Sequence, residues 1–184
     1  MDGKDYHSMK PEELRKHIAM VPQQVNLFSG TIRENLLLAD PDADDQTLME
    51  AVKEAGLLKF VQSLEKGLNS DVGNAGASLS GGQRQKIGIA RALLSKAEYM
   101  IFDEATSSVD PESEKEIWET IGHLAHTRTL IIISHRMSSV RGADCIYVLK
   151  DGRVAQQGDH ETLMAQDGVY HEQVIRQQAM EVAE

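Results

Sequence analysis

The chain has 184 residues, of which 41% are hydrophobic and 26% are charged, and its formal net charge is −10 at pH 7. This length and composition indicate a folded globular domain and exclude a fibrous or disordered chain. The negative charge argues against nucleic acid as the main partner, because phosphate binding requires a positive surface potential. The single cysteine, Cys145, excludes an internal disulfide. No apolar run approaches the roughly 18 residues that a membrane-spanning helix requires.

The apolar pattern predicts alternating helices and strands. Apolar residues recur at helical spacing from Gln46 to Leu64, and a glycine-rich loop from Gly67 to Gly82 leads into a helix from Gly82 to Leu94. The later predicted elements are strands at 99–102, 129–133 and 145–149, helices at 111–123 and 168–178, and a hairpin turn at Asp151-Gly152 into a strand at 153–155. This alternation favours an α/β fold whose mostly parallel sheet is buried on both faces.

Polar side chains follow two of the predicted strands. Asp103 and Glu104 come directly after the strand at 99–102, and Ser134 and His135 follow the strand at 129–133. In α/β sheets, ligands bind at the carboxyl ends of the strands. A carboxylate there can hold Mg²⁺, and a neighbouring carboxylate can orient or deprotonate a water molecule. Taken singly, acidic residues end many strands by chance, and a histidine such as His135 is more often a helix cap or a surface residue.

A second candidate site is the start of the helix that follows Leu79. Here Ser80, Gly81, Gly82 and Gln83 offer free backbone N–H groups and the positive end of the helix dipole, which attract phosphate. Gln23, after Val21-Pro22, lies on a loop from which it could reach a metal or a water molecule. Considered alone, these residues also fit a capped glycine-rich loop and a solvent-exposed glutamine.

Four segments in chain order, VPQQ, LSGGQ, MIFDEATSSVD and ISHR, resemble the Q-loop, signature, Walker B with D-loop, and H-loop of the ATP-binding cassette (ABC) family. The resemblance extends from about residue 2 to residue 178. It implies that Gln23 is the Q-loop glutamine, Asp103 the Mg²⁺-linked acid, Glu104 the general base and His135 the switch histidine. By the same resemblance, the D-loop consists of Ser107, Ser108, Val109 and Asp110.

The resemblance also implies how such a cassette works with its partners. Two cassettes dimerise head to tail, so that Ser80, Gly81, Gly82 and Gln83 would contact ATP held by the second nucleotide-binding domain. The segments at 26–35 and 72–76 resemble those of exporters, where they face the coupling helices of a transmembrane domain. Exporters commonly have Glu at the position of Asn74, so this chain departs from the family pattern in that loop.

The implied fold is a partial P-loop NTPase (RecA-like) core with a parallel sheet and the ABC α-helical subdomain. We expect the helical subdomain at about 25–95, the Walker B, D-loop and H-loop core at 96–160, and C-terminal helices at 161–184. The family's Walker A pattern, G-x-x-x-x-G-K-[ST], has no match, since Gly3-Lys4 is followed by Asp5. We therefore expect a chain truncated before the Q-loop, without the central Walker A strand, in which the strands at 129–133 and 145–149 have unpaired edges.

The function implied by the resemblance is that of the ATPase domain of an exporter, with ATP and Mg²⁺ as cofactors, at the cytoplasmic face of the cell membrane. We expect the chain to be inactive alone, because Walker A holds the phosphates. One alternative is a non-catalytic relic or interaction module of the same fold. Another is a DNA-repair or chromosome-organising ATPase, which would require a long heptad insertion and a basic surface, and this sequence has neither.

Overall fold

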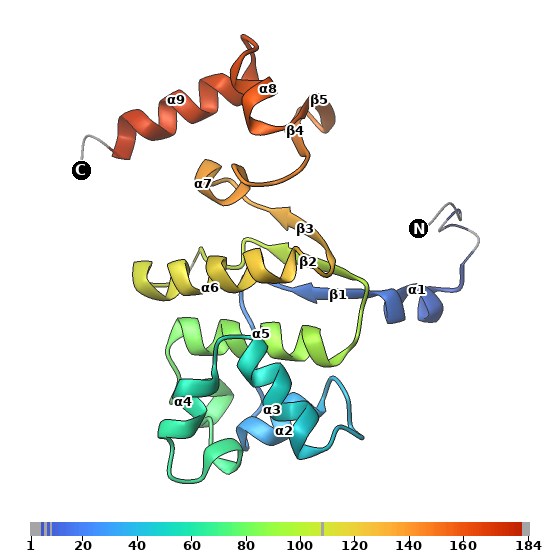
Figure 1. Ribbon diagram of the computed structural model, residues 1–184, viewed down its shortest axis with the longest axis vertical. Helices are drawn as coiled ribbons and strands as arrows, with labels where there is room; N and C mark the ends of the chain where they lie inside the picture. The colour runs from blue at the N-terminus through green and yellow to red at the C-terminus, as the bar shows by residue number, and fades with distance from the viewer. Residues whose placement is uncertain (1–4, 6, 8, 108, 182–184) are drawn as a thin grey trace. The chain divides into compact units, whose positions relative to one another are not determined.

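The computed structural model describes residues 5, 7, 9–107 and 109–181 (Figure 1). The chain divides into two compact units, one ending at Ile133 and the other beginning at Ser134. The elements of the first unit are α1 (Pro11–His17), β1 (Ile18–Val21), α2 (Ile32–Leu37), α3 (Asp45–Glu54), α4 (Leu58–Ser63), the 3₁₀ turns η2 (Gly67–Asn69) and η3 (Asn74–Gly76), α5 (Gly81–Leu94), β2 (Tyr99–Asp103), α6 (Pro111–Leu124) and β3 (Thr129–Ile133). Those of the second unit are α7 (Met137–Val140), β4 (Ile146–Lys150), β5 (Arg153–Gly158), α8 (His160–Met164) and α9 (Val169–Glu181).

The first unit contains a three-stranded parallel sheet in the order β1-β2-β3. Its strands are in register, so that Val21, Phe102 and Ile132 lie side by side on one face. That face is packed into a core to which α5 contributes Ile87 and α6 contributes Ile117. The sheet and the predicted α/β class are therefore as the sequence indicates.

The prediction that both faces of the sheet are buried is wrong. The side chains of Met20, Ile131 and Ile133 are each about half exposed, at 55%, 47% and 49%. They alternate with the core residues along β1 and β3, so they lie on the opposite face of the sheet. Within the described residues, the apolar side chains of that face are left partly open to solvent.

The helical spacing of apolar residues from Gln46 to Leu64 continues across two separate helices, α3 and α4. The chain breaks at Gly56, whose φ is +70°, a conformation that favours glycine. The Gly56 amide donates to the Lys53 carbonyl, and the Leu57 amide donates to the Val52 carbonyl. This pair of hydrogen bonds is a Schellman motif, which ends α3 and satisfies its last carbonyl groups.

In the second unit, β4 and β5 form an antiparallel hairpin that packs on α8 and α9. Its turn has positive φ at both Asp151 (+51°) and Gly152 (+73°), as a two-residue hairpin turn requires, and this confirms the predicted hairpin. Among the described strands, β3 pairs only with β2 and β4 pairs only with β5. In the part of the chain that the structure describes, no helix combines the length and apolar character needed to cross a membrane.

Candidate functional site

The carboxyl edge of the parallel sheet brings together two of the predicted segments. Val21 and Phe102 are register neighbours, so Gln23 and the Asp103-Glu104 pair follow the sheet at the same edge. The Gln23 Nε2 donates a hydrogen bond of 2.9 Å to the Ser107 hydroxyl oxygen. The predicted Q-loop and D-loop are therefore in direct contact within one chain.

Glu104 lies in a strained turn. Its φ is +47°, which is uncommon for a residue with a side chain and which recurs at functional sites. Hydrogen bonds hold this backbone: the Glu104 amide donates to the Ile133 carbonyl at 2.9 Å, and the Ser107 amide donates to the Glu104 carbonyl at 3.1 Å. Asp103 and Glu104 are both half-buried, so the turn presents two neighbouring carboxyl groups at the sheet edge.

The predicted signature residues form the N-terminus of α5. Ser80 is the N-cap, and its hydroxyl accepts from the Gln83 amide at 3.1 Å while the Gln83 side chain accepts from the Ser80 amide at 2.9 Å. This capping box fixes the first turn and leaves other amides of that turn for an anion. Ser80 is exposed and Gly81 is half-buried.

Gly82 is also required for packing, a role that the sequence did not indicate. It is buried, and a Cβ built on it would lie 2.5 Å from the Cβ of Ser113 and 3.5 Å from a methyl group of Val109. The start of α5 therefore packs directly against the predicted D-loop and the first turn of α6. Helix packing therefore requires glycine at this position, while contact of Gly82 with an anion stays a prediction.

The rest of the predicted D-loop serves as the entry to α6. The Asp110 carboxylate caps that helix by accepting from the Ser113 amide at 2.9 Å, and this hydrogen bond lowers the pKa of Asp110 from its ordinary value. Ser108 lies outside the described residues. Of this loop, Ser107 contacts Gln23 and Val109 lies beside Gly82.

The two segments expected to face coupling helices lie side by side. Thr31 and Asp71 form an antiparallel bridge, and the Val72 amide donates to the Gly30 carbonyl at 2.8 Å. The Ser29 hydroxyl donates to the Asn74 side-chain oxygen at 3.3 Å, so the residue that departs from the family pattern takes part in the contact. The Phe28 side chain in the first segment is 65% exposed.

His135 belongs to the second unit, where it is exposed. The neighbouring Ser134 hydroxyl accepts from the Arg136 amide at 3.0 Å, and it forms a second hydrogen bond, of 3.3 Å, with Ser139. These contacts shape the turn between β3 and α7, while the switch role of His135 stays a prediction.

The oxygen groups at the sheet edge fit a magnesium ion. Because the Gln23 amide nitrogen donates to Ser107, its amide oxygen is the group left for a cation, and Asp103 adds a carboxylate. Mg²⁺ is typically held by one or two such protein oxygens together with water and phosphate oxygens. Among the described residues, no three His, Cys, Asp or Glu side chains gather in a metal-binding group.

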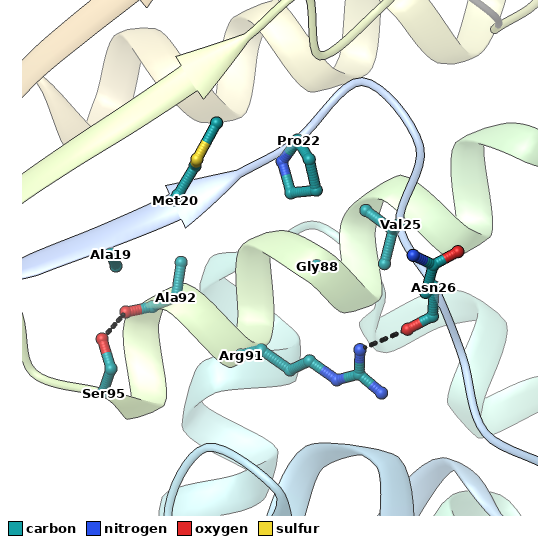
Figure 2. A pocket seen from close by; sticks show the side chains of 9 residues that line it. All are labelled: Ala19, Met20, Pro22, Val25, Asn26, Gly88, Arg91, Ala92 and Ser95. Atoms are coloured by element: carbon teal, nitrogen blue, oxygen red, sulfur yellow. Dashed lines mark hydrogen bonds between the residues drawn. The ribbon is translucent and has the colours of Figure 1, made fainter. Parts of the chain in front are cut away.

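The sequence did not indicate the residues that line a cavity next to the Gln23 loop. A cavity of about 370 Å³ lies between β1, the loop after it and α5, and Figure 2 shows Arg91 extending along it toward Asn26. Its lining includes Pro22, Val25 and Gly88. Gln85 and Arg91 of α5 donate to backbone carbonyl groups of this loop, which lie more than 60 positions away in the sequence. Local spacing along α5 therefore could not reveal these contacts.

Comparison with known proteins agrees with this arrangement. The family model described as ABC transporter matches residues 1–107. The chain is 44% identical over 179 residues to the ABC-type transporter fsqE of Aspergillus fumigatus, and 43% identical over 171 residues to the ATP-dependent lipid A-core flippase of Francisella tularensis. These alignments cover 96% and 92% of this chain, but the chain spans only 14% and 28% of those relatives.

A solved structure is similar over almost all of the chain. It is the structure of a bacterial Atm1-family ABC exporter with ATP bound, which matches with a TM-score of 0.87 at 38% identity. The match covers 96% of this chain and 31% of that one. The chain therefore belongs to the ABC transporter family, as an ATP-binding region of the exporter type.

Proposed function

We propose that this chain supplies the signature and Walker B parts of a nucleotide-binding domain that couples ATP binding and hydrolysis to transport across a membrane. The observation that supports this most is the 2.9 Å hydrogen bond from Gln23 to Ser107, because it joins the Q-loop to the turn that carries Glu104. The packing of Gly82 on Val109 and Ser113 adds the start of α5 to the same site. The proposed subdomains are those expected from the sequence, at about 25–95, 96–160 and 161–184.

In this proposal the two neighbouring carboxylates have different roles. Asp103 holds Mg²⁺ together with the amide oxygen of Gln23, and the ion neutralises charge on the phosphates when it is bound. Glu104 orients the attacking water and accepts its proton, since a carboxylate positioned beside the metal ligand is suited to general-base catalysis. His135 contacts the terminal phosphate.

The phosphate site is shared between two chains in this proposal. Ser80, Gly81, Gly82 and Gln83 contact ATP that a second nucleotide-binding domain holds, in a head-to-tail dimer. The D-loop, with Ser107, Ser108, Val109 and Asp110, lies at that dimer contact. The surface formed by the segments at 26–35 and 72–76 faces the transmembrane domain, at the cytoplasmic face of the membrane.

We also propose that the chain alone does not hydrolyse ATP. Walker A supplies the lysine and most of the backbone donors for the phosphates, and the sequence contains no match to its pattern. The few amides at the start of α5 are too few to offset the entropic cost of binding ATP.

The test compares the chain alone with the chain joined to a cassette segment that carries G-x-x-x-x-G-K-[ST]. We expect the joined protein to bind and hydrolyse Mg²⁺-ATP and the chain alone to stay at background. Failure of the joined, folded protein to bind ATP would contradict the proposed function. Turnover by the chain alone that disappears on Glu104→Gln would contradict its inactivity, because a contaminating ATPase would not respond to that substitution.

A further inference from the structure

One face of α5 holds the backbone on both sides of Gln23. The Gln85 side-chain amide donates to the Pro22 carbonyl at 3.0 Å, and the Arg91 Nη1 donates to the Asn26 carbonyl at 2.8 Å. These two carbonyl groups belong to the residue before Gln23 and to the third residue after it. The loop is therefore fastened to one helix at both of its ends.

Between these two hydrogen bonds, Val25 of the loop packs directly on Gly88 of the helix. Gly88 lies three residues from both Gln85 and Arg91, so all three share one helix face. A Cβ at Gly88 would lie 2.5 Å from a methyl group of Val25. Figure 2 shows Val25 over Gly88, with Pro22 and Asn26 on either side. Close packing thus adds a third contact between the loop and α5.

Arg91 extends the attachment to α2 through a buried asparagine. Its Nε donates to the Asn35 carbonyl at 2.7 Å, and its Nη2 donates to the Asn35 side-chain oxygen at 2.6 Å. The Asn35 side chain, which is 1% exposed, also accepts from the Phe28 amide and donates to the Phe28 carbonyl, both at 2.9 Å. The chain from Asn26 to Phe28 is therefore fixed on both α5 and α2.

The environment of Arg91 is better explained by a role in orienting the loop than by a contribution of its charge to the stability of the fold. Among the described residues, no carboxylate forms an ion pair with it, and burial lowers the pKa of its guanidinium. A half-buried cation held only by neutral oxygens carries a desolvation cost that no opposite charge offsets. What the guanidinium adds is three donors in a rigid, directed arrangement.

We infer that Gln85 and Arg91 are positioning residues that fasten the Gln23 loop to α5, so that Gln23 and the Ser80–Gln83 start of that helix move as one body. A displacement of α5 then changes the contact between Gln23 and Ser107. Through this attachment, the position of α5 determines where Gln23 lies relative to the carboxylates at the sheet edge. For its catalytic consequence, the inference rests on the proposed function.

The attachment is tested first in the full chain, without nucleotide. A nitroxide label is placed at exposed position 24 by Gln24→Cys, with Cys145→Ser removing the native thiol. We expect a slow-motion electron paramagnetic resonance spectrum that acquires a fast component in Gln85→Met and in Arg91→Met, and more of it in the double variant. The matched control is Arg84→Met, since Arg84 is on the same helix but donates to the Leu79 and Gly76 carbonyls.

Unchanged spectra in both variants would overturn the inference. Circular dichroism melts check that each variant is folded, and if Arg91→Met is not, the spectrum of Gln85→Met decides. An equally large fast component in Arg84→Met would also overturn it, because general loosening of α5 would then explain the result.

The catalytic consequence is tested in the protein joined to a Walker A segment. We expect Gln85→Met to lower kcat about two- to tenfold, the size of one lost hydrogen bond, with little change in KM. In a Gln23→Ala background the same substitution should lower kcat no further. Equal losses in both backgrounds would show a merely structural role and overturn the inference. Absence of turnover in the unsubstituted joined protein would instead contradict the proposed function, and the label spectra would still decide the attachment.

Discussion

The Gln23 amide donates to the Ser107 hydroxyl across 2.9 Å, although 84 positions separate the two residues in the chain. Gln23 follows β1 and Ser107 belongs to the turn that follows β2, so this bond joins two loops at the carboxyl edge of the parallel sheet. It also sets the orientation of the Gln23 amide and leaves its oxygen for a cation. The loops that bear the proposed metal and water ligands are thus already assembled within one chain.

The close packing of Gly82 predicts a large loss of stability on substitution. In Gly82→Ala the new methyl group would overlap Ser113, and overpacking of this kind costs about 1–3 kcal/mol. The control is Gly122→Ala on α6, where no atom lies within 4 Å of the added Cβ and helix propensity should raise stability by about 1 kcal/mol. Urea unfolding measures both variants, and similar midpoints for the two would contradict the packing argument.

Three aspartates that cap helices predict a loss of stability in acid. Backbone amides lower the pKa values of Asp44, Asp110 and Asp159 from their ordinary value of 3.8, because each carboxylate accepts a hydrogen bond at a helix N-terminus. The folded protein therefore keeps these groups ionised after the unfolded chain has bound protons. Their contribution is complete above pH 3.8 and is lost as the pH falls through the lower, folded-state values.

Asp110→Asn should accordingly remove part of this acid dependence. We expect the urea midpoints of the parent and the variant to differ more at about pH 6 than at about pH 2.5, because carboxylates of this kind titrate between these two values. Asp42→Asn, on the exposed loop before α3, is the control of equal charge change. A difference between parent and Asp110→Asn that stays constant with pH would contradict the capping role.

The strand edges predict self-association of the isolated chain. Among the residues that the structure describes, β3 pairs with β2 alone and β4 with β5 alone. The side chains of Ile131, Ile133 and Leu149 are 47%, 49% and 69% exposed. Unpaired apolar strands recruit strands of other copies. Analytical ultracentrifugation should show oligomers that Ile131→Lys with Ile133→Lys reduces. A monodisperse monomer whose β3 and β4 amides are strongly protected from hydrogen exchange would count against the unpaired edges.

The sequence alone predicted those helices and strands whose capping residues or β-branched runs mark them locally. α6 begins where Asp110 and Pro111 indicate a cap and a first turn, and β3 matches the β-branched run at 129–133. β1 was not predicted, because four apolar residues between His17 and Pro22 show no period. The break at Gly56 was not predicted either, since the apolar spacing continues across it, and only the φ of +70° and the buried Leu57 reveal the helix end.

The candidate site was predictable only as separate motifs. Asp103-Glu104 and Ser80-Gly81-Gly82 could be identified because each combines a local chemical type with the end of an element. The Gln23–Ser107 bond and the Arg91–Asn26 bond depend on tertiary packing across 84 and 65 positions, on which local periodicity carries no information. For the same reason, the close packing of Gly82 on Ser113 was not predicted.

The most direct test of the account compares Glu104→Gln with Asp103→Asn in the protein joined to a Walker A segment, by ATP binding and turnover. Glu104→Gln keeps the size of the side chain but removes the proposed base, so turnover should fall by about 10²–10⁴ while ATP binding persists. Asp103→Asn should lose binding as well, because in the proposed site Asp103 holds the metal that accompanies the nucleotide. Near-normal turnover in Glu104→Gln, or a loss of ATP binding equal to that in Asp103→Asn, would contradict the assignment of Glu104 as the general base.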